Sequence, residues 1–537
     1  MKPSLPAQSV PPPASPWSPL RVPWFRALWI AMLVSNTGAW MQDVGAGWLM
    51  TSLAPTPVMV ALVQAATALP TFFLAIPSGA LADIVDRRRY LIGVQLWMMA
   101  VALALGLLTL AGMTTAWTLI ALTFAMGIGA AMMMPAWASI IPELVPRSDL
   151  QSAVALNAMG MNVARAIGPA VAGVVIVAVG PGAVFLLNAV SFVGVIAVLG
   201  RWRREPRAST LAAERLLGAM RAGLRYARHA PPLQRVLMRG VAFYAFASAN
   251  WALLPLIVRH GLGRGAETYG IFVALIGAGA VGGALLLPRI RARVSRDRVV
   301  AGATVLFALV TLVLAWSREL LVLGAAMLAM GAAWISVMSS LMMAAQLAIP
   351  DWVRARGLAL FWALFMGGMA GGSALWGHVA EVMGMPLALS IAAGGMLPGV
   401  LLARRLSVSR HDGLNLTPSL HWPTPALAEE LEEDRGPVMV TVEYRIDPVR
   451  SAEFVRAMEK LRRVRLRDGA YFWEIFSDAE DPACISECFL VGSWLEHLRQ
   501  HERVTHADRE VQERARQFHV GEEPPVVRHL IASRRQP

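Results

Sequence analysis

The sequence predicts an all-α polytopic membrane protein of twelve transmembrane helices, followed by a small α+β domain near the C-terminus. The chain of 537 residues is 56% hydrophobic and only 15% charged, which is much less charge than soluble domains carry. Its apolar residues form uninterrupted runs of about twenty or more, long enough to cross a bilayer. The polar residues gather after residue 405. These observations together predict a membrane bundle with a separate polar domain.

The apolar runs fall into two sets of six predicted spans. The first set lies near residues 27–53, 58–82, 90–112, 115–140, 151–179 and 182–200, and the second near residues 236–259, 267–288, 298–316, 319–345, 356–382 and 385–403. The expected organisation is therefore a Pro- and Ser-rich disordered tail (1–23), an N-terminal six-helix bundle (24–200), a cytoplasmic linker (201–235), a C-terminal six-helix bundle (236–405), a polar linker (406–436) and the α+β domain (437–535).

Basic residues are unequally divided between the loops on the two sides of the predicted membrane. Arg is abundant in loops such as 86–89, 201–239 and 289–298, whereas the loops 54–57 and 180–182 have no basic residue. Arg259, Arg264 and Arg318 are the exceptions. Arg-rich short loops stay in the cytoplasm, so we expect a plasma (inner) membrane protein with both termini cytoplasmic. Orientation also explains the net charge of +13, and no nucleic acid partner is expected.

The two halves of the membrane region look like copies of each other. Residues 141–147 (Ile-Pro-Glu-Leu-Val-Pro-Arg) correspond to residues 349–354 (Ile-Pro-Asp-Trp-Val-Arg), about 205 positions later, and each segment leads into a Gly-rich span. An internal repeat of six spans is how many transporters build two bundles that move around a central site. The repeat favours transport over a receptor or an enzyme.

The C-terminal domain shows the order of elements of a ferredoxin-like fold, βαββαβ. Strands are expected at 438–444, 471–476, 484–493 and 526–532, and helices at 448–463 and 494–518. An amphipathic helix is also expected around residues 208–226 of the linker between the two bundles.

The loop after the second span resembles a motif of the major facilitator superfamily. That motif is Gly-x-x-x-Asp-Arg-x-Gly-Arg-Arg, and Gly79, Asp83, Arg87 and Arg88 match it, whereas Ile84 and Asp86 depart from it. The resemblance implies a cytoplasmic gating loop and the two-bundle fold of this superfamily.

Three further segments resemble one subfamily, the transmembrane secretion effectors that are similar to bacterial siderophore exporters. They are residues 35–49 of the first span, residues 157–169 of the fifth span, and residues 492–505, which resemble the monooxygenase-like domain appended to that subfamily. The resemblance implies export of a small organic molecule, siderophore-like or drug-like, by proton antiport through alternating access. It also implies that the C-terminal domain can pair as a homodimer.

Four polar residues within the spans are the candidates for proton coupling and the transport path. Asn36 and Asp43 share one face of the first span, and Asn162 and Arg165 share one face of the fifth. An ionisable residue at membrane depth marks an ion or substrate path by default. The alternative is a structural role, with Asp43 holding the outer gate shut. Asp43 and Arg165 are one conceivable ion pair.

The fifth span also carries Gly168, Pro169 and Gly173, which resemble the antiporter motif Gly-Pro-x-x-Gly-Gly, with Ala172 in place of one Gly. Small residues let another helix approach closely, so packing is the alternative interpretation. In this superfamily the motif accompanies export. Trp40, Trp48 and Trp137 could stack on a flat substrate or anchor helix ends.

No catalytic residue, cofactor or metal site is expected, and the protein is predicted not to be an enzyme. His497 and His501 are spaced i,i+4, but no third ligand accompanies them, so we expect a solvated helix face. The alternatives that remain open are an importer or uniporter of the same fold, or a membrane-anchored oxidative enzyme or sensor that uses the C-terminal domain. The predicted partners are a small-molecule substrate, the lipid bilayer and protons.

Overall fold

The computed structural model describes residues 15–202, 216–402, 406–407, 414–422 and 435–532. The chain forms two compact units. The first consists of Met1–Ala213, Gly240–Ser340 and Trp362–Arg404, and the second of Glu214–Arg239, Leu341–Phe361 and Arg405–Pro537.

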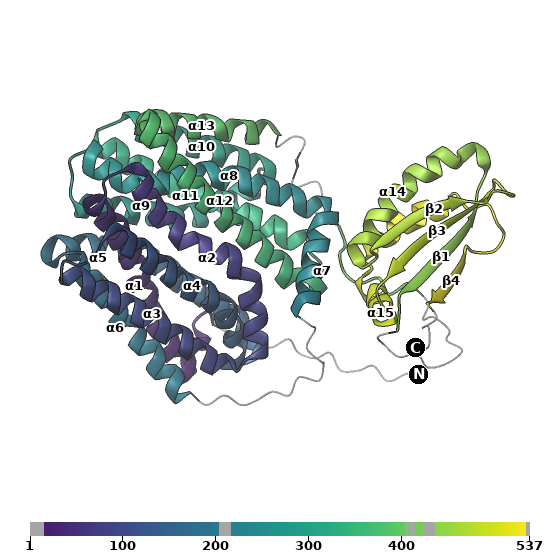
Figure 1. The fold of residues 1–537 in the computed structure, drawn as a ribbon, viewed down its shortest axis with the longest axis horizontal. Coiled ribbons are helices and arrows are strands. Elements are labelled where there is room, and N and C mark those ends of the chain that lie inside the picture. The colour runs from purple at the N-terminus through teal and green to yellow at the C-terminus, as the bar shows by residue number, and fades with distance from the viewer. Residues whose placement is uncertain (1–14, 203–215, 403–405, 408–413, 423–434, 533–537) are drawn as a thin grey trace. The chain divides into compact units, whose positions relative to one another are not determined.

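Twelve long helices occupy the positions of the twelve predicted spans (Figure 1). They are α1 (Pro23–Leu53), α2 (Pro57–Ile84), α3 (Arg87–Leu110), α4 (Ala116–Leu144), α5 (Leu150–Val179), α6 (Pro181–Arg201), α8 (Pro231–Leu256), α9 (Ala266–Arg291), α10 (Arg296–Trp316), α11 (Leu320–Leu347), α12 (Arg354–Met383) and α13 (Met385–Leu402). Proline begins α1, α2 and α6, where its missing N–H leaves no hydrogen bond unmade.

Ten helical segments among the described residues are long and apolar enough to cross a membrane. The two predicted spans outside that set are α1 and α13. α1 carries the polar residues Asn36, Gln42 and Asp43, and α13 has only 18 residues. The expected polytopic helical architecture is confirmed.

Helix packing within the first unit brings α1 between α5 and α6, and places α5 against α9 of the second six-helix set. A buried polar pair joins α1 to α6, because the Asn188 side-chain amide donates to Gln42 Oε1. Hydrogen bonds between polar side chains help hold helices together where water is scarce. The α5–α9 contact joins the two six-helix sets.

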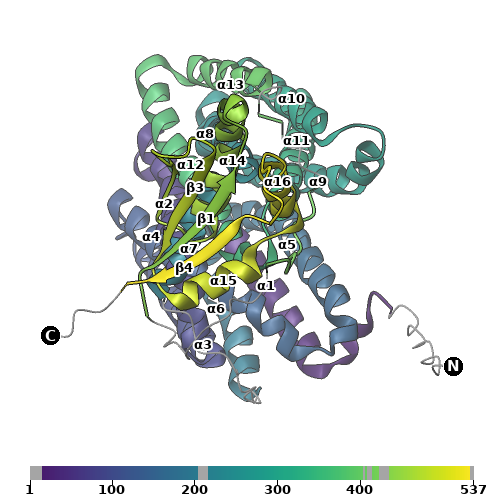
Figure 2. The same cartoon turned by 90° about the vertical axis from the view of Figure 1, so that its right-hand side faces the viewer.

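The second unit contains a four-stranded antiparallel sheet in the order β2-β3-β1-β4, with neighbouring strands visible in Figure 2. The strands are β1 (Val438–Arg445), β2 (Phe472–Ser477), β3 (Cys484–Val491) and β4 (Val526–Ile531), and the helices are α14 (Ser451–Asp468), α15 (Trp494–Arg503) and α16 (His506–Arg516). Alternate residues of β1 and β3 are buried, as expected for a sheet with one covered face. The predicted ferredoxin-like topology is confirmed.

One predicted helix is wrong in detail. Residues 494–518 form two helices rather than one, because Thr505 starts a new helix. Its side chain accepts the Asp508 N–H, and the Asp508 carboxylate accepts the Thr505 N–H at 2.9 Å. This reciprocal capping box defines a helix N-terminus.

The linker between the two six-helix sets contributes α7 (Leu216–His229) to the second unit. An amphipathic helix was predicted around residues 208–226 of this linker. The part of that range before residue 216 lies outside the described residues, and the remainder is helical.

Candidate functional site

The Asp43 carboxylate belongs to the middle of α1, with its side chain exposed. Among the residues that the structure describes, no basic side chain forms an ion pair with it. It interacts electrostatically with Tyr269 of α9, a helix of the other six-helix set. An exposed carboxylate on a spanning helix is where a proton can be bound and released.

One turn further along α1, aromatic and basic side chains join the two repeats. The Trp48 indole stacks on the Tyr269 ring, with centroids 6.2 Å apart and an angle of 21°. The Arg259 guanidinium lies 5.4 Å from the Trp48 ring centre and donates to Thr51 Oγ1 at 2.9 Å. Arg259 follows α8, on the side whose loops otherwise lack Arg; we call this the Arg-poor side. Its exceptional position therefore has a structural use, which is to hold the ends of α1 and α8 together.

The Arg165 guanidinium lies over the Trp40 indole, 5.1 Å from the ring centre. Its Nε atom is buried and has no hydrogen-bond partner among the described residues. In the described part of the chain, Arg165 and Asp43 are not paired, so the conceivable ion pair is not formed in this structure. The aromatic face takes the place of a counter-ion.

The two predicted asparagines are placed differently. The Asn162 amide donates back to the Ala158 carbonyl of its own helix at 3.0 Å, while Asn36 is half-buried on α1. Neither is brought into hydrogen-bonding contact with Asp43 or Arg165 in the described structure. Their role in the transport path stays a prediction.

The antiporter-like motif of α5 lies at a tight seam between helices. A Cβ atom at Gly168 would lie 2.7 Å from Trp40 Cβ of α1, and one at Gly173 would lie 2.9 Å from the Ala266 carbonyl oxygen of α9. Both helices would have to shift to accept a larger residue. Gly173 therefore lets the two repeats meet near the Arg-poor ends of α5 and α9, and Pro169 is buried between these two glycines.

The predicted gating loop connects α2 to α3 on the Arg-rich side. Arg87 Nη1 donates to Glu143 Oε1 of α4 at 2.9 Å, and Arg88 Nε donates to the Leu199 carbonyl oxygen at the end of α6 at 2.6 Å. Gly79 and Asp83 belong to the last turns of α2, and the surroundings of both residues lie outside the described part of the structure. The two arginines thus tie three helices of the first set together.

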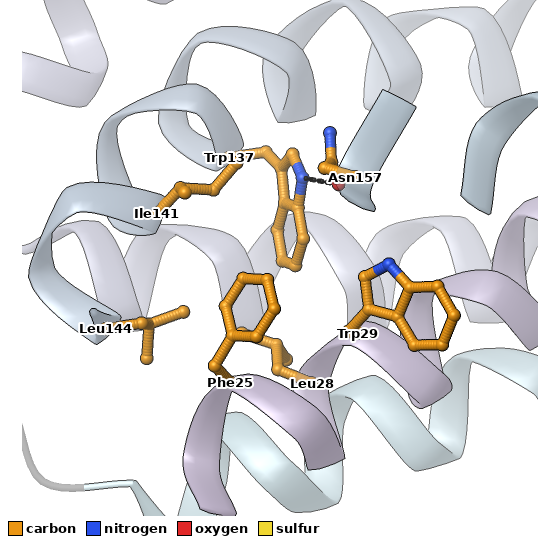
Figure 3. A pocket seen from close by; sticks show the side chains of 7 residues that line it. All are labelled: Phe25, Leu28, Trp29, Trp137, Ile141, Leu144 and Asn157. Atoms are coloured by element: carbon orange, nitrogen blue, oxygen red, sulfur yellow. Dashed lines mark hydrogen bonds between the residues drawn. The ribbon is translucent and has the colours of Figure 1, made fainter. Parts of the chain in front are cut away.

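A small apolar pocket lies between the Arg-rich ends of α1, α4 and α5 (Figure 3). Phe25, Leu28, Trp29, Trp137, Ile141, Leu144 and Asn157 line it. The Trp137 N–H donates to Asn157 Oδ1 at 3.0 Å. Trp137, one of the three tryptophans considered for substrate stacking, thus forms a contact between α4 and α5. The pocket volume open to a water-sized probe is about 10 Å³, which is room for about one water molecule and far below the roughly 300–1,000 Å³ of common ligand sites. We assign no substrate to it.

The C-terminal domain buries several charged side chains. Arg465 forms a two-pronged ion pair with Glu487, and Arg467 pairs with Asp468 and Asp508. Burial raises the pKa of Asp468 to about 6. Buried ion pairs of this kind are weak evidence for stability, because the cost of removing the charges from water offsets their attraction.

The expected solvated histidine face is wrong for His497. Its side chain is only 1% exposed, and its ring packs against His529 of β4 and His501. Burial, helped by neighbouring His529, lowers the pKa of His497 to about 3 and that of His501 to about 4. The i,i+4 spacing identified the pair correctly, but only the packing of β4 against α15 shows that it is buried.

Sequence reasoning missed Tyr269 and the role of Arg259. Tyr269 had no motif to single it out. Arg259 stood out only as an exception to the charge pattern, and that exception was the available signal.

Two six-helix sets joined by a central seam form the fold of a multi-pass membrane protein. Solved structures share this fold at low identity. A bacterial homologue of the human lysosomal transporter Spinster, in an inward-facing and unoccupied conformation, matches with a TM-score of 0.56 and 13% identity, covering 72% of this chain and 96% of that one. A mutant of the nucleoside transporter NupG matches with a TM-score of 0.61 and 12% identity, covering 72% and 100%.

The model of a family described as transmembrane secretion effector matches residues 14–537. The chain therefore belongs to the transmembrane secretion effectors of the major facilitator superfamily. An uncharacterised transporter of this superfamily, YfiS of Bacillus subtilis (strain 168), is 24% identical over 255 residues, covering 46% of this chain and 59% of its own length. The staphyloferrin A transporter of Staphylococcus aureus (strain NCTC 8325 / PS 47) is 22% identical over 260 residues, covering 47% and 64%. The match thus spans about three fifths of these relatives.

Proposed function

We propose that the protein exports a small organic molecule, siderophore-like or drug-like, by proton antiport. The observation that carries the proposal is Asp43, an exposed carboxylate of α1 that pairs with no basic side chain in the described part of the chain and lies beside the seam between the two six-helix sets. The relative named for staphyloferrin A supports the substrate class, and the antiporter-like motif at Gly168 to Gly173 supports the outward direction.

The mechanism that fits this geometry is alternating access. In this structure the contacts of α1 and α5 with α8 and α9 lie toward the Arg-poor side. With that side extracellular, as the distribution of Arg supports, the substrate enters from the cytoplasm. Separation of the Trp48–Tyr269 stack and of the Gly173 seam then opens the outside. A proton on Asp43 competes with the bound substrate, so release outward is coupled to proton uptake.

A homodimer through the C-terminal domain fits the open face of its sheet. Phe472, Leu490, Met439 and Leu530 stand in register across the four strands, and Phe472 and Leu530 are exposed. A second copy would cover this apolar row. Leu490→Glu should then shift the protein in detergent to a monomer, measured by light scattering, whereas an unchanged mass would remove the proposed dimer.

The experiment that tests the function compares metabolites released by cells with and without the protein under iron limitation. We expect at least one iron-chelating or amphipathic compound to fall in the medium and rise inside cells lacking it. If every compound keeps its distribution, export of this substrate class is wrong. A compound that accumulates inside only when the protein is present would instead identify an importer.

A further inference from the structure

The second unit joins three parts of the chain that are far apart in the sequence. They are α7 in the linker between the repeats, the loop from Ala348 to Val353 between α11 and α12, and the C-terminal domain. The proposed transport path lies in the first unit, so the contacts of the C-terminal domain with the other two parts need their own explanation.

The first contact fixes α7 to the loop. The Tyr226 hydroxyl donates to the Ala348 carbonyl oxygen at 2.7 Å, and the Tyr226 ring meets the edge of Trp352 with centroids 5.9 Å apart. Gly223 brings the backbone of α7 so near to Arg356 that a Cβ there would lie 2.9 Å from Arg356 Cβ. Tyr226 is only 2% exposed, so separating α7 from the loop would expose a large aromatic ring.

The C-terminal domain touches both partners of that contact. The Arg503 guanidinium lies 4.6 Å from the Trp352 ring centre, and the Arg467 guanidinium lies 5.6 Å from that of Tyr226. Each aromatic ring is therefore covered by one arginine of the domain. Cation–π contacts of this kind strengthen when water is excluded.

Carboxylates inside the domain hold these arginines in place. Glu496 accepts from Arg503 at 2.7 Å and from Arg225 of α7 at 2.9 Å, and Asp508 holds Arg467 at 2.6 Å. Burial alone would raise the pKa of Glu496, but Arg503 and Arg225 outweigh burial and lower it. The contact is thus preorganised and largely buried, unlike an ordinary surface ion pair.

From this arrangement we infer that the C-terminal domain is an intramolecular clamp that holds the linker helix α7 to the α11–α12 loop and thereby restrains the transport cycle. Three helices carry the restraint onward, because α8, α11 and α12 each run without a break from the second unit into the first. A change at Glu496 should therefore alter not only α7 but also the distant ends of these helices. The inference goes beyond the proposed function and needs neither the substrate nor a proton gradient for its test.

The test is hydrogen exchange of the full chain in lipid nanodiscs, read by mass spectrometry on wild type and Glu496→Gln. We expect exchange in peptides covering 216–229 and 348–353 to rise about fivefold or more, with β1 and β3 unchanged. We also expect altered exchange in residues 257–270, beside the seam. The matched control is Asp481→Asn, which removes the exposed Arg445–Asp481 pair (3.0 Å) of the same domain, and it should leave all these peptides unchanged.

Two results would overturn the inference. The first is that hydrogen exchange of α7 is the same in Glu496→Gln as in wild type. The second is that exchange of α7 rises while exchange of residues 257–270 does not change, which would mean that the contact is only local packing. If Glu496→Gln unfolds the domain, seen as lost protection in β1 and β3, Trp352→Leu replaces it. That variant lies outside the domain and removes the ring that Arg503 and Tyr226 both contact, and the same two criteria apply.

Discussion

The guanidinium of Arg165 lies over the indole of Trp40, 5.1 Å from the ring centre, where α5 crosses α1. Because its Nε has no hydrogen-bond partner, this aromatic face is a main stabilising contact of the charge in the described structure. A cation–π contact contributes about 0.5–1 kcal/mol at an exposed site and about 2 kcal/mol or more when water is excluded, and Arg165 is half-buried.

Trp40→Leu should therefore lower the melting temperature of the detergent-solubilised protein and reduce transport. The melting temperature is measured by size-exclusion chromatography of samples heated to a series of temperatures. The matched control is Trp117→Leu, because Trp117 is 67% exposed at the start of α4 and its loss should have little effect. Equal melting temperatures for the two variants would contradict the assignment.

The bond between Arg87 and Glu143 gives the second prediction. Both side chains are partly buried, and a hydrogen bond between charged groups contributes about 1.5–3 kcal/mol. Arg87→Ala should reduce transport severalfold while the protein stays in the membrane. Arg87→Glu combined with Glu143→Arg should recover part of the loss, whereas Arg89→Ala, an exposed neighbour, should be nearly neutral. A double variant as inactive as Arg87→Glu alone would rule out the pairing as the functional contact.

The seam at Gly173 gives the third prediction. Gly173→Ala places a methyl group 2.9 Å from the Ala266 carbonyl oxygen, so the repeats cannot close fully on the Arg-poor side. We expect a large fall in transport and faster hydrogen exchange in residues 266–277. Gly302→Ala is the control, since nothing lies within 4 Å of a Cβ there. Normal transport by Gly173→Ala would show that the seam is not a gate.

The buried histidines make the C-terminal domain sensitive to acid. Folding lowers the pKa of His497 from 6.5 to about 3, so the unfolded state binds a proton that the folded state does not. The free energy of unfolding of the domain is therefore highest above pH 6.5, where His497 is neutral in both states. It decreases as the pH falls from 6.5 toward 3. Between pH 7.5 and pH 5.5 this group alone should cost about 1 kcal/mol, and His501 acts in the same direction.

His497→Gln should reduce that acid loss. The measurement is hydrogen exchange of β4 and α15 in the full chain, corrected for the intrinsic effect of pH on exchange. The control is His506→Gln, a half-buried residue at the start of α16. The prediction fails if wild type and His497→Gln lose protection equally on acidification.

The sequence predicts the spans well because their signal is long and local. Runs of apolar residues and the charges between them locate α2 to α6 and α8 to α12 within a few residues. The break at Thr505 was missed because the preference of Trp494–Arg516 for helix outweighed a short capping signal. A capping box competes with helix continuation by a small free energy, so pattern alone does not decide it.

The candidate site was only partly predictable for a different reason. Asp43 and Arg165 stand out because charge is rare in a span, but their neighbours depend on how the two repeats meet. Tyr269, which partners Trp48, is separated from it by more than two hundred residues. Likewise, no local pattern shows that Glu496 faces Arg225 of α7.

The most direct test of the account is the coupling of transport to protons through Asp43. Inside-out vesicles containing wild type or Asp43→Asn receive the compound identified by the metabolite comparison, with an acidic interior. We expect that wild type accumulates the compound until a protonophore is added. We expect no accumulation driven by the gradient in Asp43→Asn, which keeps the shape of the side chain but cannot titrate. Accumulation by Asp43→Asn with the wild-type dependence on pH would contradict it.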